Sequence, residues 1–174
     1  KLKKKYNSIM VKSDRVIAIS RFINSHILSN YNINKEKTVI IHRGVNIEQY
    51  NYFKVSNERL ISLSKQFNIP EDCFVILLPG RVTRWKGHKL FIEAINKLQR
   101  SDIICLIVGD FQGRNKYYAE LERLIDQFKL KNNFRIIPNQ IDMATIYKLA
   151  DVVVSSSLEP EAFGRVVAEA QAMG

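Results

Sequence analysis

The chain has 174 residues, of which 46% are hydrophobic and 25% charged, as is ordinary for a packed globular protein with one full domain and a little more. This composition excludes disordered and fibrous proteins. No run approaches the roughly eighteen apolar residues of a membrane-spanning helix, and the basic start Lys1–Lys5 is not followed by the apolar stretch of a signal peptide. We therefore expect a cytoplasmic protein, and the lysine at position 1 suggests a segment of a longer chain.

The formal net charge of +10 is distributed unevenly. Residues 1–43 hold ten Lys or Arg against Asp14 and Glu36, whereas residues 44–174 hold seventeen against fifteen acidic residues. A basic segment on a nearly neutral domain suits an anionic membrane surface or an anionic ligand, and predicts peripheral membrane association at the inner face of the membrane. A solvated lysine-rich helix that only keeps the protein in solution explains the charge about equally well.

Cysteine and histidine usage argues against a metal site. Cys73 and Cys105 each lie at or in an apolar run, without a second cysteine or a histidine at ligand spacing. The three histidines are equally scattered. We expect buried free thiols and no metal.

The first predicted elements form a short region that ends in the forties or fifties. Arg15–Ser20 reads as an apolar strand, Ser20 as the cap of the following helix, and Thr38–His42 as a second strand. A turn at residues 43–46 leads into a polar stretch, 46–57, that we interpret as a linker.

The second region alternates strands with helices up to the end of the chain. Its strand runs are apolar without polar alternation, as expected when helices cover both faces of a parallel sheet. This pattern predicts a doubly wound, Rossmann-like α/β domain over residues 73–174, preceded by a linker and first helix over 46–72 and by a separate region over 1–45. The expected strands are Phe74–Pro79, Ile103–Val108, Phe134–Ile137 and Asp151–Ser155; helices run through Leu90 to Leu98, through Tyr117 to Phe128, over Met143–Leu149 and from Phe163 or Gly164 onward.

Such a sheet binds ligands outside the carboxyl ends of its strands. This rule singles out the loops 80–86, 109–115, 138–142 and 156–164. Neither a Walker phosphate loop nor a dinucleotide-binding glycine motif is present, which disfavours an NTPase or a dehydrogenase.

The loop after the first of these strands carries two cations. Arg81 follows Gly80 directly and Lys86 opens the next helix, so that a planar guanidinium, a mobile ammonium and free helix N–H groups could hold a diphosphate together. Two ordinary surface cations near a turn are an equally good interpretation from position alone.

Two glutamates lie eight positions apart near the end of the chain. As an acid and base pair for glycoside hydrolysis, Glu161 and Glu169 are rather far apart, because eight residues of helix rise about 12 Å and hydrolytic carboxylates sit roughly 5 to 9.5 Å apart. They suit the hydroxyls at two ends of one extended ligand better, with its phosphates over the helix N-terminus between them. For Glu161 the alternative is a charge that satisfies the helix dipole. A solvated helix position is the alternative for Glu169, but small and apolar neighbours indicate a buried carboxylate that needs a partner.

Three further residues have open roles. Gly109 and Gly113 mark a tight loop in which backbone could approach a ligand, although turn formation alone explains them as well. Trp85 is a stacking platform or a loop anchor, and we favour the anchor.

From about Asp14 to Gly174 the chain resembles the C-terminal, nucleotide-sugar-binding half of a GT-B glycosyltransferase of family four, a group of retaining enzymes. The resemblance rests on several short motifs that occur in the family's order and at its spacing. They are Asp14–Ser20, Val39–Asn46, Gly80 and Arg81 with Lys86 and Gly87, Val108–Asp110, Ala150–Val154, Ser157, Glu161–Gly164 and Ala168–Ala170.

The resemblance implies a site for a nucleotide-diphosphate sugar. Glu161 would contact sugar hydroxyls, Glu169 the ribose, and Arg81 with Lys86 the diphosphate leaving group, in the loop that starts at Gly80. The remaining implied contacts are the Gly109 loop after the next strand, the loop near Ile141 beside the base, and backbone amides at Phe163 and Gly164 on sugar and phosphate. The group usually needs no divalent metal and no other cofactor, since the cations and the helix dipole stabilise the developing charge.

Some positions depart from the family pattern. Arg43 replaces a common Asn, so its charge could meet a phosphate or an acidic acceptor. Glu159 competes with Glu161, but only Glu161 has the eight-residue offset. By this resemblance, residues 1–45 are the end of the acceptor domain and the start of the linker, and the donor domain over 73–174 is incomplete at its C-terminus. Nearly all of the acceptor domain is missing, so we expect the segment alone not to turn over.

We predict a retaining transfer from a nucleotide sugar to an unknown glycan or lipid-linked acceptor, as in envelope polysaccharide or lipopolysaccharide synthesis. The alternative is a nucleotide-binding module without transfer activity. Nucleic-acid binding ranks low because aromatic residues do not interleave with the basic ones.

Overall fold

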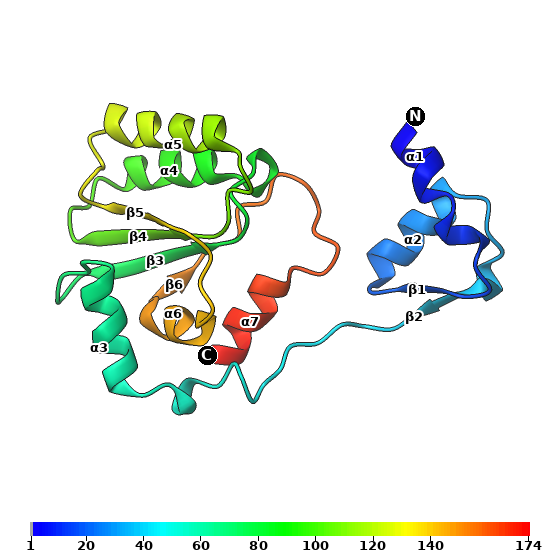
Figure 1. The fold of residues 1–174 in the computed structure, drawn as a ribbon, viewed down its shortest axis with the longest axis horizontal. Coiled ribbons are helices and arrows are strands. Elements are labelled where there is room, and N and C mark those ends of the chain that lie inside the picture. Colours follow the sequence, from blue (N-terminus) through cyan, green and yellow to red (C-terminus); the bar gives the residue numbers. More distant parts are fainter. Residues whose placement is uncertain (1) are drawn as a thin grey trace. The chain divides into compact units, whose positions relative to one another are not determined.

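The computed structural model describes residues 2–174, and the chain divides into two compact units (Figure 1). Unit 1 comprises Lys1–Gly44 and Glu161–Gly164, and unit 2 comprises Val45–Pro160 and Arg165–Gly174.

Unit 1 is a small two-stranded parallel sheet with a helix between its strands. β1 pairs with β2 from Val16 opposite Thr38 to Ala18 opposite Ile40. Both strands are shorter than predicted, because only these three residue pairs form the ladder. The predicted cap is confirmed: the Ser20 hydroxyl accepts the amide of Ile23 at 3.2 Å. The elements of unit 1 are α1 (Leu2–Asn7), η1 (Met10–Lys12), β1 (Val16–Ala18), α2 (Arg21–Asn30), η2 (Lys35–Lys37) and β2 (Thr38–Ile40).

Unit 2 is a four-stranded, wholly parallel sheet in the order β5-β4-β3-β6. The prediction of a doubly wound α/β sheet is confirmed, and three strands have the bounds expected from sequence. Its elements are η3 (Tyr52–Lys54), α3 (Asn57–Gln66), β3 (Phe74–Pro79), η4 (Arg84–Lys86), α4 (His88–Leu98), β4 (Ile103–Val108), α5 (Asn115–Gln127), β5 (Phe134–Ile137), α6 (Met143–Leu149), β6 (Val152–Val153) and α7 (Arg165–Met173).

The last strand and the last helix differ from expectation. β6 has two residues instead of five, although backbone bonds to β3 flank it, from Asp151 N to Val75 O and from Val154 N to Leu77 O. The helix begins at Arg165, one or two residues later than predicted, after Gly164 at a φ of 73°.

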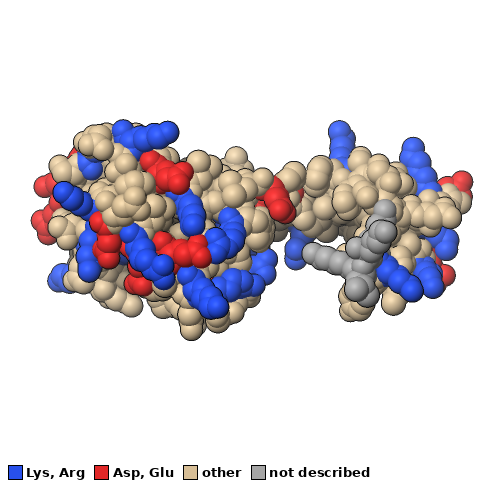
Figure 2. All heavy atoms as spheres, turned by 90° about the horizontal axis from the view of Figure 1, so that it is seen from above, with Lys and Arg blue, Asp and Glu red and all other residues tan. Residues whose placement is uncertain are grey.

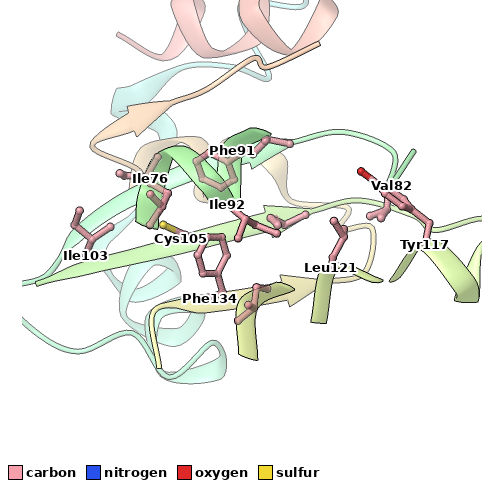
Figure 3. Close-up of a cluster of buried hydrophobic side chains, with 13 residues drawn as sticks. Ile76, Val82, Phe91, Ile92, Ile103, Cys105, Tyr117, Leu121 and Phe134 are labelled. Atoms are coloured by element: carbon pink, nitrogen blue, oxygen red, sulfur yellow. The ribbon is translucent and has the colours of Figure 1, made fainter. Parts of the chain in front are cut away.

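Alternate residues of the central strands feed two separate cores. On one face Ile76, Leu78 and Cys105 pack with α4 and α5 (Figure 3). On the other, Leu77 and Leu106 pack with α3, α6 and α7 (Figure 1). Burial on both faces explains why these strands read as unbroken apolar runs. The two cores fix the sheet, and hence the carboxyl edge from which its loops emerge.

The polar stretch read as a linker is locally ordered. Asn46 and Asn51 each cap a turn, because their side-chain oxygens accept the amides of Glu48 and Phe53 at 3.0 Å. Val55 is buried in the α3–α6 core. Asparagines of this polar stretch therefore stabilise turns.

Both cysteines are free, as predicted; Cys105 is buried and Cys73 is half-buried. Burial raises the pKa of the Cys105 thiol to about 12. Among residues 2–174, no helix combines the length and apolarity needed to cross a membrane.

Candidate functional site

The strand order of unit 2 creates a topological switch point between β3 and β6. The chain builds outward from β3 to β4 and β5, then crosses back to place β6 on the other side of β3. Loops on the two sides of such a point diverge and leave a crevice at the carboxyl edge. The loops concerned are 80–87 after β3, called the cationic loop below, and the segment that follows β6.

Hydrogen bonds and close packing hold the cationic loop against the segment after β6. Ser156 Oγ donates to the carbonyl of Lys86 at 3.0 Å, and the amide of Leu158 donates to the carbonyl of Trp85 at 2.7 Å. Gly87 is required here: its φ is 72°, and a Cβ would lie 1.9 Å from the carbonyl oxygen of Ser156. These contacts fix the backbone of Lys86, which directly precedes Gly87.

The Lys86 side chain extends back over the end of β3. An added Cβ on Gly80 would lie 3.6 Å from Lys86 Cε and 3.9 Å from Nζ. The same amine lies 4.6 Å from the centre of the Trp85 ring, within cation–π range. The Trp85 ring thus contacts the side chain of the next residue in the loop, and its role as a loop anchor stays a prediction.

Arg81 is exposed beside these groups, and no ion pair or side-chain hydrogen bond of its guanidinium is found among the described residues. The structure thus brings Gly80, Arg81 and Lys86 together at the carboxyl edge of the sheet, as predicted.

Gly109 belongs to the same edge but has a packing role. An added Cβ would lie 1.9 Å from the carbonyl oxygen of Gly80, and Val82 N donates to Asp110 O at 2.9 Å. Close packing of the loops after β3 and β4 therefore accounts for this glycine. At Gly113, with a φ of 71° and no neighbour within 4 Å of a Cβ, turn formation accounts for it.

His88, at the start of α4, supports the cationic loop from inside. The fully buried ring lies with Nδ1 3.2 Å from the carbonyl of Thr83, and its Nε2 has no hydrogen-bond partner. Burial lowers the pKa of His88 to about 4, with the hydrogen bond to Thr83 opposing the shift and the charge of Lys86 adding to it. The imidazole is therefore neutral at pH 7.

Glu169 lies on the buried side of α7, and its side chain is held on both oxygens. The residue is 5% exposed, Tyr147 Oη donates to Oε2 at 2.8 Å, and Arg165 Nε lies 3.2 Å from Oε1. This placement contradicts the solvated alternative and confirms that the carboxylate needs a partner. An ionised carboxylate accepts about four hydrogen bonds, so both oxygens keep acceptor capacity.

The Glu169 carboxylate contributes to raised pKa values of two tyrosines. Burial, together with Glu169, raises the pKa of Tyr147 well above its usual range, and the same causes raise the pKa of Tyr50 to about 12. Their rings meet edge to face at 5.9 Å. Sequence reasoning missed both, because Tyr147 and Glu169 are 22 positions apart and no local pattern pairs them.

Ile141 lies in the loop after β5 and is 97% exposed. The next residue holds this loop: Asp142 caps α6 by accepting Thr145 N at 3.2 Å, and its carboxylate also accepts Arg59 Nε and Nη2 at 3.1 and 2.6 Å. Ile141 is therefore exposed on a turn that the contacts of Asp142 hold in place.

Glu161, Phe163 and Gly164 belong to unit 1, where Ser20 Oγ donates to the carbonyl of Ala162 at 3.1 Å. Glu169 belongs to unit 2. The spacing between the two carboxylates is therefore not defined within either unit. Among residues 2–174, no group of three or more His, Cys, Asp or Glu is placed to hold a metal.

Comparison with known proteins gives consistent matches. Residues 61–174 match the family described as Glycosyl transferases group 1. A lipopolysaccharide 1,2-N-acetylglucosaminetransferase of Salmonella typhimurium is 35% identical over 122 residues, covering 65% of this chain and 32% of that protein. The chain spans less than half the length of the curated relatives it matches.

Two solved structures have the same fold. A glycosyltransferase from Rickettsia africae has a TM-score of 0.89 at 40% identity, covering 99% of this chain and 45% of that one. HepE from Anabaena, in complex with UDP-glucose, has a TM-score of 0.86 at 25% identity, covering 98% and 47%.

Proposed function

We propose, from the premise that the chain belongs to the glycosyl transferases of group 1 and has the GT-B fold, that unit 2 holds the nucleotide-diphosphate-sugar donor of a retaining transferase. The observation that carries this proposal is the switch point, where the loop that contains Arg81 and Lys86 is held to the segment after β6 by contacts at residues 85–87. The UDP-glucose bound by HepE supports a nucleotide-sugar ligand.

Each side chain has a defined task in this proposal. Arg81 and Lys86 bind the diphosphate, in the loop that begins at Gly80. Gly109 keeps the adjoining loop close, Ile141 flanks the base, and Glu169 accepts the ribose hydroxyls. The family resemblance further assigns Glu161 to the sugar hydroxyls and the amides of Phe163 and Gly164 to the sugar and phosphate.

Charge stabilisation of the leaving group follows from these positions. As the glycosidic bond breaks, negative charge grows on the diphosphate, and preorganised cations lower the barrier without needing to reorganise. The N-terminus of α7 adds its dipole, because its first turn contains no acidic residue. We expect neither a divalent metal nor another cofactor to be required.

The acceptor is proposed to be a glycan or lipid-linked glycan of the cell envelope, as in lipopolysaccharide synthesis. The Salmonella relative and the basic segment 1–43 support this assignment. The same segment supports action at the inner face of a membrane, with the protein in the cytoplasm.

Calorimetry with UDP and UDP-glucose tests the donor site. Lys86→Ala and Glu169→Gln should each weaken UDP binding at least about tenfold, which corresponds to one lost charge-assisted hydrogen bond. Glu161→Ala should mainly reduce the ratio of UDP-glucose to UDP affinity. Lys97→Ala, in the exposed last turn of α4, is the matched control.

An unchanged UDP affinity in Glu169→Gln would overturn the ribose assignment. Binding without transfer or donor hydrolysis by the full-length protein, across a broad panel of nucleotide sugars, would favour the nucleotide-binding module instead.

A further inference from the structure

A groove of about 800 Å³ lies beside the cationic loop, between that loop and the start of α5. Its volume is within the range of about 300 to 1,000 Å³ of small-molecule sites. Its lining residues come from the loops after β3 and β4 and from the first turn of α5. They are Arg81, Thr83, Arg84, Trp85, Gly113, Arg114, Asn115, Lys116 and Tyr117.

The lining is strongly cationic. Four of its nine residues are Arg or Lys and none is acidic. Figure 2 looks onto the face covered by α4 and α5, and shows Lys and Arg atoms at the end of unit 2 where β3 and β4 finish, with a few Asp and Glu atoms between them. Two carboxylates close to the lining in sequence already have partners: Glu120 pairs with Arg84 and with Lys89, and Asp110 Oδ1 accepts the amide of Gln112 at 2.8 Å.

The cationic side chains of the groove differ in whether they already have an ion-pair or hydrogen-bond partner. Arg84 is ion-paired and lies 4.9 Å from the centre of the Tyr117 ring, and Arg114 Nη1 donates to Gln112 Oε1 at 2.7 Å. No ion pair of Arg81 or Lys116 is found among the described residues. Both are exposed, Arg81 in the loop after β3 and Lys116 in the first turn of α5. Because Arg81 is assigned to the donor diphosphate above, the positive charge that remains for a second ligand is that of the α5 side, chiefly Lys116.

Helix α5 adds to this potential. Arg114 at its N-cap makes no side-chain capping bond, and its first turn contains no acidic residue. The free N–H groups and the helix dipole at this end favour an anion. This contribution supplements the charge of the four cationic side chains.

We propose that this groove binds a phosphate carried by the sugar acceptor. The proposal rests on the donor site proposed above, which the groove adjoins through Arg81. Arg114 and Lys116 lie on the α5 side, beyond the loop assigned to the donor diphosphate, so the groove serves a second anion. Guanidinium forks match phosphate oxygens, and the concave shape suits a discrete sugar phosphate.

NMR titration with glucose 6-phosphate, in the presence of saturating UDP, tests the proposal. We expect amide shifts concentrated at residues 113–117, and none with glucose. Arg114→Gln combined with Lys116→Gln should weaken glucose 6-phosphate at least about tenfold, for one to two lost charge-assisted bonds, and change UDP affinity less than twofold. The matched control combines Arg123→Gln with Lys131→Gln, which removes the same charges at exposed positions elsewhere in unit 2.

Several outcomes would overturn the proposal. Equal loss in the control pair would indicate attraction by overall charge only. Competition between UDP and glucose 6-phosphate would place the phosphate in the donor site. The groove would be assigned to a membrane surface if the parent chain bound no glucose 6-phosphate and the pair Arg114→Gln and Lys116→Gln lost binding to vesicles containing phosphatidylglycerol. A chain that fails to bind UDP at all contradicts the donor site instead, so the two failures are distinguishable.

Discussion

The two sides of the proposed donor site within unit 2 are held in place by different means. Backbone contacts hold the cationic loop: Gly87 packs on the Ser156 carbonyl, and Leu158 N donates to the Trp85 carbonyl. Side chains from another helix hold Glu169, through Tyr147 and the exposed Arg165. Because backbone packing holds the cationic loop, substitution of Gly87 should strongly destabilise it. Because two separate side chains hold Glu169, substitution of either one should remove only part of its support.

Gly87→Ala should give the largest effect. The alanine must adopt a φ near 72° with its Cβ against the Ser156 carbonyl oxygen, so we expect the free energy of unfolding to fall by about 3 to 4 kcal/mol. Urea denaturation measures it. Gly113→Ala is the matched control, since it shares the positive φ but has open space around it, and should cost only about 1 kcal/mol. Equal losses in both variants would mean that backbone strain alone, without the contact to Ser156, explains the glycine.

Acidification should loosen the same loop through His88. Its pKa is about 4 in the folded chain against 6.5 for the ordinary group, so between these values the unfolded chain binds the extra proton. Neutral His88 contributes about 3 kcal/mol to the free energy of unfolding. This contribution is fully present above pH 6.5 and is lost as the pH falls through 4. Denaturant titrations at pH 7, 5.5 and 4 measure this slope.

His88→Gln should reduce stability at pH 7 but flatten the dependence on pH. The exposed His42→Gln serves as control and should keep the parent slope. A parent slope that persists in His88→Gln would assign the acid sensitivity to another group.

Sequence reasoning succeeded where the signal is local. Unbroken apolar runs gave β3, β4 and β5 with their observed bounds, because both faces of each strand are buried. Gly80, Arg81 and Lys86 were placed at one edge because they border a strand end and a helix start. The short β6 illustrates the limit, since pairing with β3, and not composition, decides where that strand ends.

Long-range contacts were beyond reach. Burial of Glu169 followed from its apolar neighbours, but Tyr147 as its partner depends on how α6 packs beside α7. The packing of Gly109 on Gly80 was not predicted either, because this contact depends on β3 and β4 lying side by side. Eight positions between Glu161 and Glu169 suggested a spacing, but the two residues fall in different units.

Tyr147→Phe should give an intermediate effect on the carboxylate side. Removing a hydroxyl that donates to a buried carboxylate costs about 2 kcal/mol, and UDP affinity should fall as Glu169 loses its orientation. Thermal and urea unfolding give the first quantity and calorimetry the second. Combining the change with Glu169→Gln isolates the pair, since the coupling disappears once either partner is gone. Tyr6→Phe, exposed in unit 1, should leave both quantities unchanged.

Arg165→Ala should have the smallest effect on stability. The guanidinium is 74% exposed, so solvent screens its pairing with Glu169, and we expect a loss below about 1 kcal/mol that shrinks further in high salt. Unfolding at 0.05 and 0.5 M NaCl measures this dependence, with Arg123→Ala as an exposed arginine control. If Arg165→Ala instead costs as much as Tyr147→Phe at both salt concentrations, the ion pair is the main support of the carboxylate. Glu169 would then be held chiefly by a neighbour on its own helix, a contact at i and i+4 that the sequence alone could have indicated.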